Sequence, residues 1–260
     1  MTSAVFLPEV RFDGAVRAVD FISDIHLAEA MPATAAAWEA LLAGTTADAL
    51  FLLGDVFEVW VGDDARERPF EARCVEALAR AARRLPVYVQ HGNRDFLLGA
   101  GFAAATGVRL LADPCTVHAF GRRVLVTHGD ELCVDDVPYQ VFRQQVRDPA
   151  YQAQFLAQPL EARLAIAAKM RAASRERHDE PVTFADVDPA AARRWLADAD
   201  TDTMIHGHTH RPGSQALEGW TRHVLSDWDL DTPAPERRRA EVLRWTAAGF
   251  ARLTPAQAAA

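Results

Sequence analysis

The sequence predicts an α/β protein whose sheets mix parallel and antiparallel strands. Three observations support this fold class. Strand-like and helix-like segments alternate in the first half of the chain, a hairpin signal lies near residue 121, and strand-like segments return in the last third. At 260 residues the chain can bury a large core. Half of its residues are apolar and a quarter are charged, which is ordinary globular composition.

The first half consists of short apolar runs separated by longer segments with helical periodicity. The former are typical of buried strands and the latter of helices. In chain order we expect a strand over 19–22, a helix over 34–43, a strand over 50–53, a helix over 70–84 and a strand over 87–89. This alternation favours an α/β architecture with ligands at the strand ends.

The strands after residue 115 indicate antiparallel pairing. Two apolar runs, 116–120 and 123–127, flank Gly121-Arg122, which is a hairpin turn signal. Further strands are expected over 203–205, 222–225 and 241–245. The sheet content is therefore predicted to be mixed.

Residues 137–177 form a helical segment without a strand candidate. Pro149 and Pro159 divide it into short helices, because proline is tolerated at a helix start but not inside a helix. The last helix carries an apolar stripe: Leu160, Leu164 and Ala168, with Ile166 and Met170 beside it. From 161 to 177 five basic residues (Arg163, Lys169, Arg171, Arg175, Arg177) stand against Glu161 and Glu176. Such a cationic amphipathic helix is a candidate lid or membrane contact, and a helical hairpin that only covers a sheet edge explains the same pattern.

Composition argues against several classes of protein. The net charge of −8 disfavours a generic nucleic-acid binder, so no nucleic-acid partner is expected. Three cysteines without metal-type spacing indicate a reduced, cytoplasmic protein. The first residues do not resemble a signal peptide, and no run approaches the ~20 apolar residues that span a bilayer. We expect a protein that at most lies on a membrane surface, with residues 1–16 and 254–260 peripheral.

Five short blocks place metal-binding side chains directly after strand-like runs. They are Asp24-Ile25-His26, Gly54-Asp55, Gly92-Asn93-Arg94-Asp95, His128-Gly129-Asp130 and Gly207-His208-Thr209-His210. An isolated histidine is more often a satisfied polar residue than a ligand. Seven candidate ligands that each close an apolar strand are much harder to explain as structural. The pattern predicts one polar site that binds metal.

The number of ligands favours two ions over one. Seven ligands exceed the needs of a single ion with open positions, whereas two ions can share a carboxylate, for which Asp55 is the natural candidate. Oxygen and imidazole ligands without thiolate favour Mn²⁺, Fe²⁺, Co²⁺ or Zn²⁺ over Ca²⁺. Two metals ~3.5–4 Å apart stabilise both the attacking and the leaving oxygen of a displacement at phosphorus. Hydrolysis of a phosphate ester is the first hypothesis, and dinuclear amidohydrolysis remains open.

The order of the five blocks resembles the calcineurin-like metallophosphoesterases. The resemblance implies a four-layer αββα sandwich of two mixed β-sheets with a helical lid insertion. It implies a single metallophosphoesterase domain over 17–253, in which the helical insert at about 134–185 acts as a substrate lid.

Three motifs are more specific within that superfamily: GDVFEVWVGDD at 54–64, GNRD at 92–95 and IHGHTHRP at 205–212. They resemble the UDP-2,3-diacylglucosamine pyrophosphohydrolases of lipid A biosynthesis. The resemblance implies water attack on the α-phosphorus of the diphosphate, giving UMP and 2,3-diacylglucosamine 1-phosphate. It also implies two divalent cations, with Mn²⁺ expected, and a peripheral location on the cytoplasmic face of the inner membrane. No obligate protein partner is expected.

The family pattern also implies roles for individual residues. One metal would take Asp24, His26, Asp55 and His210, and the other Asp55, Asn93, His128 and His208. Catalysis is assigned to Asp55, Asn93 and Arg94.

Arg94 stands where many relatives in the superfamily have histidine. Arginine cannot act as an acid, because its pKa exceeds ~12. It suits a leaving group that is already a stable anion, such as a sugar 1-phosphate, and its guanidinium can bind a diphosphate in a bidentate way.

The substrate contacts implied by the family are Asn93, Arg94, Asp136, Tyr139, Arg171, Ser174, His178 and His208. His178 stands where the family commonly has asparagine. No lysine follows it, since Lys169 is the only lysine of the chain. Either arginines substitute, or the substrate preference differs. A related two-metal phosphoesterase acting on another nucleotide diphosphate or phosphodiester is therefore an alternative, and a binding scaffold without catalysis is a third.

Overall fold

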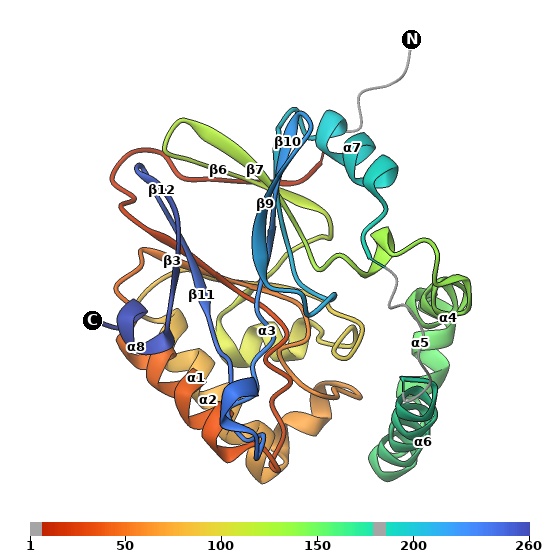
Figure 1. The fold of residues 1–260 in the computed structure, drawn as a ribbon. Helices are drawn as coiled ribbons and strands as arrows, with labels where there is room; N and C mark the ends of the chain where they lie inside the picture. Colours follow the sequence, from red (N-terminus) through yellow and green to blue (C-terminus); the bar gives the residue numbers. More distant parts are fainter. Residues whose placement is uncertain (1–6, 179–185) are drawn as a thin grey trace.

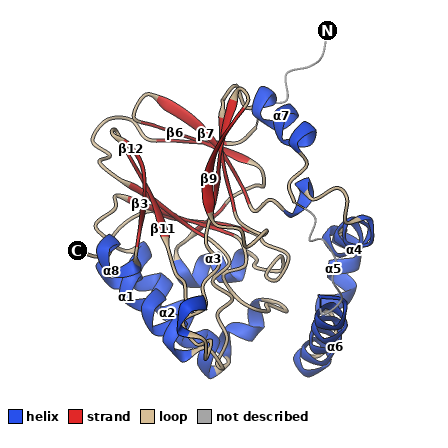
Figure 2. Ribbon diagram, viewed as in Figure 1, coloured by secondary structure: helices blue, strands red, loops and turns tan. Residues whose placement is uncertain are grey.

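Two six-stranded β-sheets lie face to face in the computed structural model, which describes residues 7–178 and 186–260 and no side chain of 172–178 (Figure 1, Figure 2). In order across the first sheet, the strands are β12 (Gly249–Leu253), β11 (Val242–Thr246), β2 (Val19–Ile22), β3 (Ala49–Leu53), β4 (Val87–Gln90) and β5 (Arg109–Leu110). In order across the second sheet, they are β1 (Glu9–Arg11), β6 (Cys115–Ala119), β7 (Arg122–Thr127), β8 (Thr203–His206), β10 (Trp220–Val224) and β9 (Gly213–Leu217). Both sheets contain parallel and antiparallel pairs, as predicted.

The central strands are apolar throughout because both of their faces are covered. In β3, Phe51 and Leu53 point into the core between the sheets, whereas Leu50 and Leu52 point towards the helices on the outer face. This alternation follows from the two-residue period of a strand. An apolar run without polar alternation therefore indicates a strand buried on both sides.

Helices form the outer layers. α1 (Pro32–Gly44), α2 (Pro69–Ala82), α3 (Ala100–Thr106) and the short α8 (Pro255–Ala258) lie over the first sheet (Figure 1). The second sheet is covered by α7 (Pro189–Asp198), which packs through Ala192 and Leu196. The 3₁₀ turns are η1 (Asp63–Glu67), η2 (Asp130–Leu132) and η3 (Pro235–Arg237). The predicted four-layer sandwich is confirmed, with α7 as the outer helix over the second sheet.

Every predicted strand and helix outside the insert corresponds to an observed element, but several short elements were not predicted. These are β1, β5, β9, β12, α3, α7 and α8. The hairpin turn is also displaced by one residue. Ala119 pairs with Arg122, so Phe120 and Gly121 form the turn, both with positive φ as in a type I′ turn.

Two elements within the predicted peripheral segments 1–16 and 254–260 are part of the sandwich, as far as residues 7–16 and 254–260 are described. β1 pairs with β6 in parallel, and α8 packs against α1 with Ala258 fully buried. These contacts could not be predicted from the sequence, because elements of three or four residues are too short to show a periodicity.

The insert consists of three helices beside the sandwich: α4 (Val137–Arg147), α5 (Pro149–Leu156) and α6 (Leu160–His178) (Figure 1). Pro149 is the first residue of α5, and Pro159 directly precedes α6, as predicted for the two prolines. Asp136 and Asp148 cap α4 and α5. Each side chain accepts a hydrogen bond from the backbone N–H three residues further on, at Tyr139 and Tyr151.

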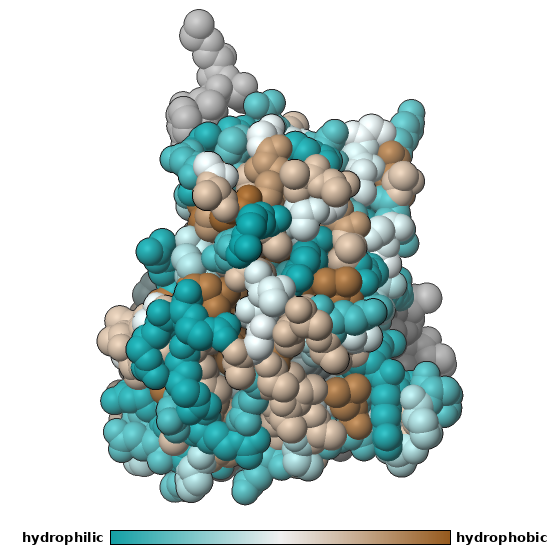
Figure 3. Space-filling view, turned by 90° about the vertical axis from the view of Figure 1, so that its left-hand side faces the viewer, coloured by the Kyte–Doolittle hydropathy of each residue, from teal (hydrophilic) through white to brown (hydrophobic). Residues whose placement is uncertain are grey.

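Within the described residues, no helix has the length and apolarity needed to cross a membrane. The face turned away from the insert mixes hydrophilic and apolar surface in small areas (Figure 3). Large exposed apolar side chains are concentrated elsewhere. Of the six in the described part of the chain, five belong to the insert: Val134, Val137, Val141, Leu156 and Met170.

Candidate metal centre

The seven predicted ligands converge where the carboxyl ends of five strands meet. β2, β3 and β4 are parallel neighbours in one sheet, and β7 and β8 are parallel neighbours in the other. Because the carboxyl ends of parallel strands lie at one edge, the loops that follow them share a crevice. The residues brought together are Asp24, His26, Asp55, Asn93, His128, His208 and His210.

The backbone at these residues is strained. Among non-glycine residues in the described chain, seven have positive φ, and five of them are Asp24, His26, Asp55, His208 and His210. This region is unfavourable for residues with a Cβ, and such outliers concentrate at functional sites. The loops are held there by parallel pairing, in which His26 N donates to Asp55 O at 3.0 Å.

Two glycines allow the loops to approach the carboxylates. A Cβ on Gly92 would overlap the Asp55 carboxylate, and a Cβ on Gly207 would overlap that of Asp24. Only glycine can bring its backbone this close to the side chain of the neighbouring loop. The blocks Gly92-Asn93 and Gly207-His208 therefore contain glycine for a steric reason.

One group of donors surrounds Asp24. The Asp24 carboxylate is fully buried and lies 3.4 Å from His210 Nε2, and His26 Nε2 lies 3.3 Å from His210 Nε2. Both Asp24 oxygens also accept from the backbone N–H of His208, at 3.1 and 3.0 Å. One ligand atom from each of Asp24, His26 and His210 lies within 4.8 Å of the others.

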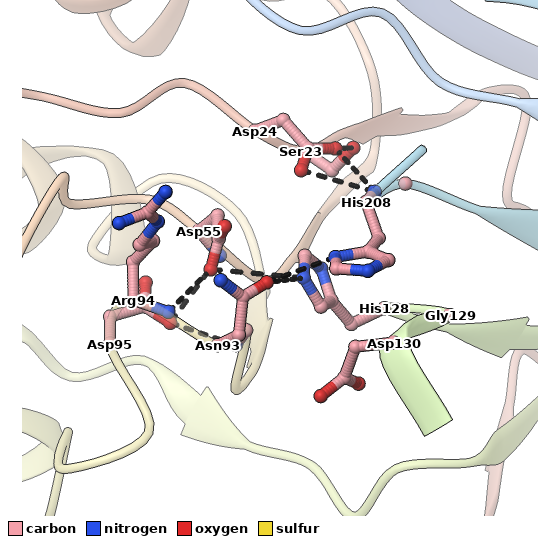
Figure 4. Close-up of polar contacts among 12 residues, drawn as sticks. Ser23, Asp24, Asp55, Asn93, Arg94, Asp95, His128, Gly129, Asp130 and His208 are labelled. Carbon is pink, nitrogen blue, oxygen red and sulfur yellow. Dashed lines mark hydrogen bonds and ion pairs between the residues drawn. The ribbon is translucent and has the colours of Figure 1, made fainter. Parts of the chain in front are cut away.

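A second group of donors surrounds Asn93. Its Oδ1 lies 3.1 Å from His128 Nε2 and 2.9 Å from His208 Nδ1 (Figure 4). Asp55 lies between the two groups, with one oxygen 3.7 Å from His128 Nε2 and the other 3.9 Å from His26 Nε2. Asp55 is therefore placed where one carboxylate can serve two cations.

In His128 and His26, the ring nitrogen Nδ1 has a partner outside the group of donors. The other ring nitrogen, Nε2, faces the site. His128 Nδ1 donates to Leu53 O at 2.9 Å, which leaves Nε2 to face Asp55 and Asn93. His26 Nδ1 lies 3.0 Å from a carboxylate oxygen of Glu58. An acceptor beside one ring nitrogen favours the tautomer that carries the proton there and presents a lone pair on the other nitrogen. This donor set, carboxylate, amide oxygen and imidazole, fits divalent first-row metals.

The electrostatics of the crevice favour positive charge. Although burial lowers the pKa of His128, the charges of Asp55, Asp24 and Asp130 raise it to about 9. Burial and the neighbouring carboxylates raise the pKa of Asp55, against the effect of His128 and His26. The buried carboxylates thus create a negative field that a cation would neutralise.

Asp95 holds two of the ligand loops together. Its carboxylate accepts from Gly92 N at 2.8 Å and Val56 N at 2.7 Å, and more weakly from Asp55 N and Phe57 N. The carboxylate therefore fixes the loops after β3 and β4 relative to each other.

Three further residues support the site without having been assigned a role from the sequence. Glu58 contacts His26, Asp227 lies 3.6 Å from His210 Nδ1, and Asp113 accepts from the backbone N–H of His128. Although burial opposes it, the hydrogen bond from His26 and the surrounding positive charges lower the pKa of Glu58 to about 2. Glu58 was visible within the motif at 54–64, whereas Asp227 and Asp113 lie outside every motif.

Arg94 lies beside Asp55 at the rim of the site (Figure 4). Its backbone N–H donates to Asp55 Oδ1 at 2.8 Å. Its side-chain Nε is buried and has no hydrogen-bond partner among the described residues. The Nε–H of the guanidinium is therefore a free donor beside Asp55 in the described structure.

The insert reaches the site through α4. The Tyr139 hydroxyl donates to Asp130 at 2.5 Å, and its ring lies 5.8 Å from that of His208. Arg143 donates to the same Asp130 carboxylate at 2.8 Å. Asp136 caps α4 and lies further out. Asp130 thus anchors the insert beside the candidate metal ligands.

α6 contacts the loops after β3. Arg171 lies 2.7 Å from Glu58, and Arg163, which is almost fully buried, pairs with Asp64 and donates to Val61 O. The side chains of Ser174 and His178, the two other predicted substrate contacts on α6, lie outside the described residues.

A groove of about 340 Å³ lies between α6 and the sandwich. Leu164 and Ala168 line it from α6, and Leu27 and Phe70 line it from the opposite side. The Glu58–Arg171 pair forms part of its wall. The predicted apolar stripe of α6 thus faces a groove along part of its length.

Comparisons with known proteins agree with this architecture. The family model for calcineurin-like phosphoesterases matches residues 18–212. The UDP-2,3-diacylglucosamine hydrolase of Stenotrophomonas maltophilia is 46% identical over 222 residues, covering 80% of this chain and 90% of that protein. The enzymes of the same name from Chromobacterium violaceum (46% over 220 residues; 81% and 90% covered) and Bordetella pertussis (45% over 224 residues; 83% and 87% covered) are similarly related. The chain therefore belongs to the calcineurin-like phosphoesterase family and, within it, to the family of these hydrolases.

Proposed function

We propose that this protein hydrolyses the diphosphate of UDP-2,3-diacylglucosamine, giving UMP and 2,3-diacylglucosamine 1-phosphate in lipid A biosynthesis. The observation that carries the proposal is the convergence of seven donors around Asp55, in a chain 46% identical to hydrolases named for this substrate. Water attacks the α-phosphorus, and the bond from that phosphorus to the oxygen bridging the two phosphates breaks.

Two divalent cations, with Mn²⁺ as the expected metal, supply Lewis acidity at the phosphate and make water acidic enough to attack near neutral pH. Asp24, His26, Asp55 and His210 would hold one cation. Asp55, Asn93, His128 and His208 would hold the other. This division follows the two groups of donors on either side of Asp55.

Arg94 neutralises charge on the diphosphate. Its guanidinium remains protonated, so it stabilises the departing sugar phosphate without giving up a proton. Asn93 orients the same phosphate from the other side of Asp55. The buried, unpartnered Nε of Arg94 supports this role within the described structure.

The insert, at about 134–185, acts as the substrate lid of a single catalytic domain over 17–253. Asp136, Tyr139 and Arg171, together with Ser174 and His178, would contact the head group, along with His208. The support is the position of Tyr139 against His208 and of Arg171 at the groove. The apolar part of the groove lining, which includes Leu27, Phe70, Leu164 and Ala168, would contact acyl chains.

A peripheral position on the cytoplasmic face of the inner membrane fits this substrate. The insert carries most of the exposed large apolar side chains in the described part of the chain, including Val137 and Val141, each 62% exposed. These side chains would contact the lipid surface from which a diacyl substrate is taken.

A second candidate is a related phosphoesterase acting on another nucleotide diphosphate. It is favoured by His178 in place of the usual asparagine and by the lack of a lysine after it. A binding scaffold without catalysis has less support, because all seven donors are present.

The test is an assay of the purified protein with Mn²⁺ and UDP-2,3-diacylglucosamine in ¹⁸O-labelled water. We expect UMP that carries the label, with much slower cleavage of a UDP-sugar without acyl chains. Equal rates on the two substrates would establish the second candidate. Failure to bind metal together with absence of turnover would establish the scaffold.

A further inference from the structure

Glu58 is the only carboxylate in the described structure that touches both a candidate metal ligand and a side chain of α6. Its position follows from the parallel pairing of two loops. Leu27 N donates to Val56 O at 2.9 Å, and Glu58 N donates to Leu27 O at 3.1 Å. This register brings the Glu58 side chain to the outer edge of His26.

The two oxygens of Glu58 have different partners. Oε2 lies 3.0 Å from His26 Nδ1, and Oε1 lies 2.7 Å from Arg171 Nη2. Glu58 is 18% exposed and His26 is 14% exposed, so both groups are largely shielded from water. An ion pair in this setting is screened less than a surface pair.

The contact with His26 has a direct consequence for the metal site. A carboxylate 3.0 Å from Nδ1 favours the proton on that nitrogen, which leaves Nε2 as the lone-pair nitrogen facing Asp55 and His210. Such outer partners orient a histidine ligand and raise its basicity. The contact with Arg171 holds the same carboxylate from its other oxygen, so Glu58 cannot turn freely.

We propose that Glu58 is a positioning residue that couples the seating of α6 on the catalytic domain to the geometry of the metal site at His26. The proposal rests on the metal centre of the proposed function, and it is independent of the substrate. Because coupling between two sites is reciprocal, loss of the Arg171 contact should weaken metal binding, and loss of metal should loosen α6.

The test measures Mn²⁺ binding to the full-length protein without substrate, by isothermal titration and by electron paramagnetic resonance. Glu58→Gln keeps the size of the side chain but removes the charge. We expect one of the two bound ions to bind about 10- to 100-fold more weakly, as is usual for outer partners of ligands. The matched control is Glu71→Gln, because Glu71 lines the same groove but pairs with Arg68. Its metal binding should remain that of the wild type.

A double-mutant cycle tests the link to α6. Arg171→Met should weaken the same ion by at least about twofold, the lower limit for residues in one network. In the Glu58→Gln background it should have no further effect. Amide hydrogen exchange in residues 160–171 should slow on Mn²⁺ binding in the wild type, and this response should be lost in Glu58→Gln.

The outcomes separate the two proposals. A wild-type protein that binds two ions, with Glu58→Gln unchanged, overturns the positioning role and leaves the metal centre intact. Equal effects of Arg171→Met with and without Glu58 overturn the coupling. A wild-type protein that binds no ion overturns the metal centre and, with it, the role of Glu58.

Discussion

Asp55 and Arg94 differ in what they can contribute, although they are neighbours in space. Asp55 is fixed by its backbone and by Asp95, and its two oxygens face different imidazoles. The backbone of Arg94 donates to Asp55 and accepts from Trp60 N, and its guanidinium lies beside Asp55, with no partner for Nε among the described residues (Figure 4). We therefore propose that Asp55 binds metal and that Arg94 neutralises charge on the substrate.

Asp55→Ala should abolish both metal occupancy and turnover, because both groups of donors lose their shared carboxylate. Metal content after gel filtration and the release of UMP measure the two effects. Asp48→Ala is the matched control: Asp48 precedes the same strand at its opposite end and pairs with Arg17. Retention of two ions in Asp55→Ala would remove the assignment of Asp55 as the shared ligand.

Arg94→Ala should lower turnover on the order of 10²–10³-fold and leave the metal content unchanged. A loss of this size is usual when one preorganised donor is removed from an oxygen that gains negative charge in the transition state. Steady-state kinetics and metal analysis on one preparation check this. Arg73→Ala, at an exposed arginine that pairs with Glu39 on α1, serves as the control. Wild-type rates in Arg94→Ala would contradict the role in stabilising the leaving group.

At the scale of elements, the insert is attached to the sandwich through arginines. Arg143 contacts Asp130, Arg147 donates to Gly92 O, and Arg163 pairs with Asp64. Each of these partners lies in or near a loop that carries candidate metal ligands. The described helices therefore contact these loops through directed hydrogen bonds and ion pairs.

Gly62→Ala should displace the start of α6. The residue has φ of 131°, and a Cβ there would overlap Arg163 and Leu156. We expect faster hydrogen exchange in residues 160–171 and a raised KM for the lipid substrate. Gly249→Ala is the control, because Gly249 has φ of 119° with open space around it. It carries comparable backbone strain without contact to the insert, so equal exchange in α6 of both variants would contradict the prediction.

At the scale of the whole molecule, buried ion pairs join segments far apart in sequence. Arg244 on β11 donates to both oxygens of Asp20 on β2, and also to the carbonyl of Ala258 at the end of α8. Asp20 is fully buried and also accepts from Thr45. This network connects the C-terminal helix to the central strands of the first sheet.

Arg244→Met should destabilise the protein by about 3 kcal/mol, because it leaves the buried Asp20 carboxylate without its partner. Denaturant unfolding measures the change, and UMP release at 25 °C should be unaffected. Arg80→Met removes an exposed arginine that pairs with Glu76 on α2, and it should change stability by less than about 0.5 kcal/mol. Similar unfolding of the two variants would show that the Arg244 network contributes little.

The sequence alone was sufficient to predict the fold class, the central strands and the seven donors. These features are local: an apolar run marks each strand, and each donor stands directly after one. The predicted insert helices are likewise observed, because proline positions and apolar spacing are properties of short segments. The metal identity, the lid role and the substrate contacts remain predictions.

Only the tertiary structure shows which neighbouring side chains contact the seven donors, and which elements β1 and α8 pack against. The pairing of Glu58 with His26 and Arg171 depends on the register of two loops and on the seating of α6, which no local pattern encodes. β1 and α8 are stabilised by the sheet edge and by α1, not by their own three or four residues. Local patterns therefore determined the identity of the donors, whereas long-range packing determined their orientation.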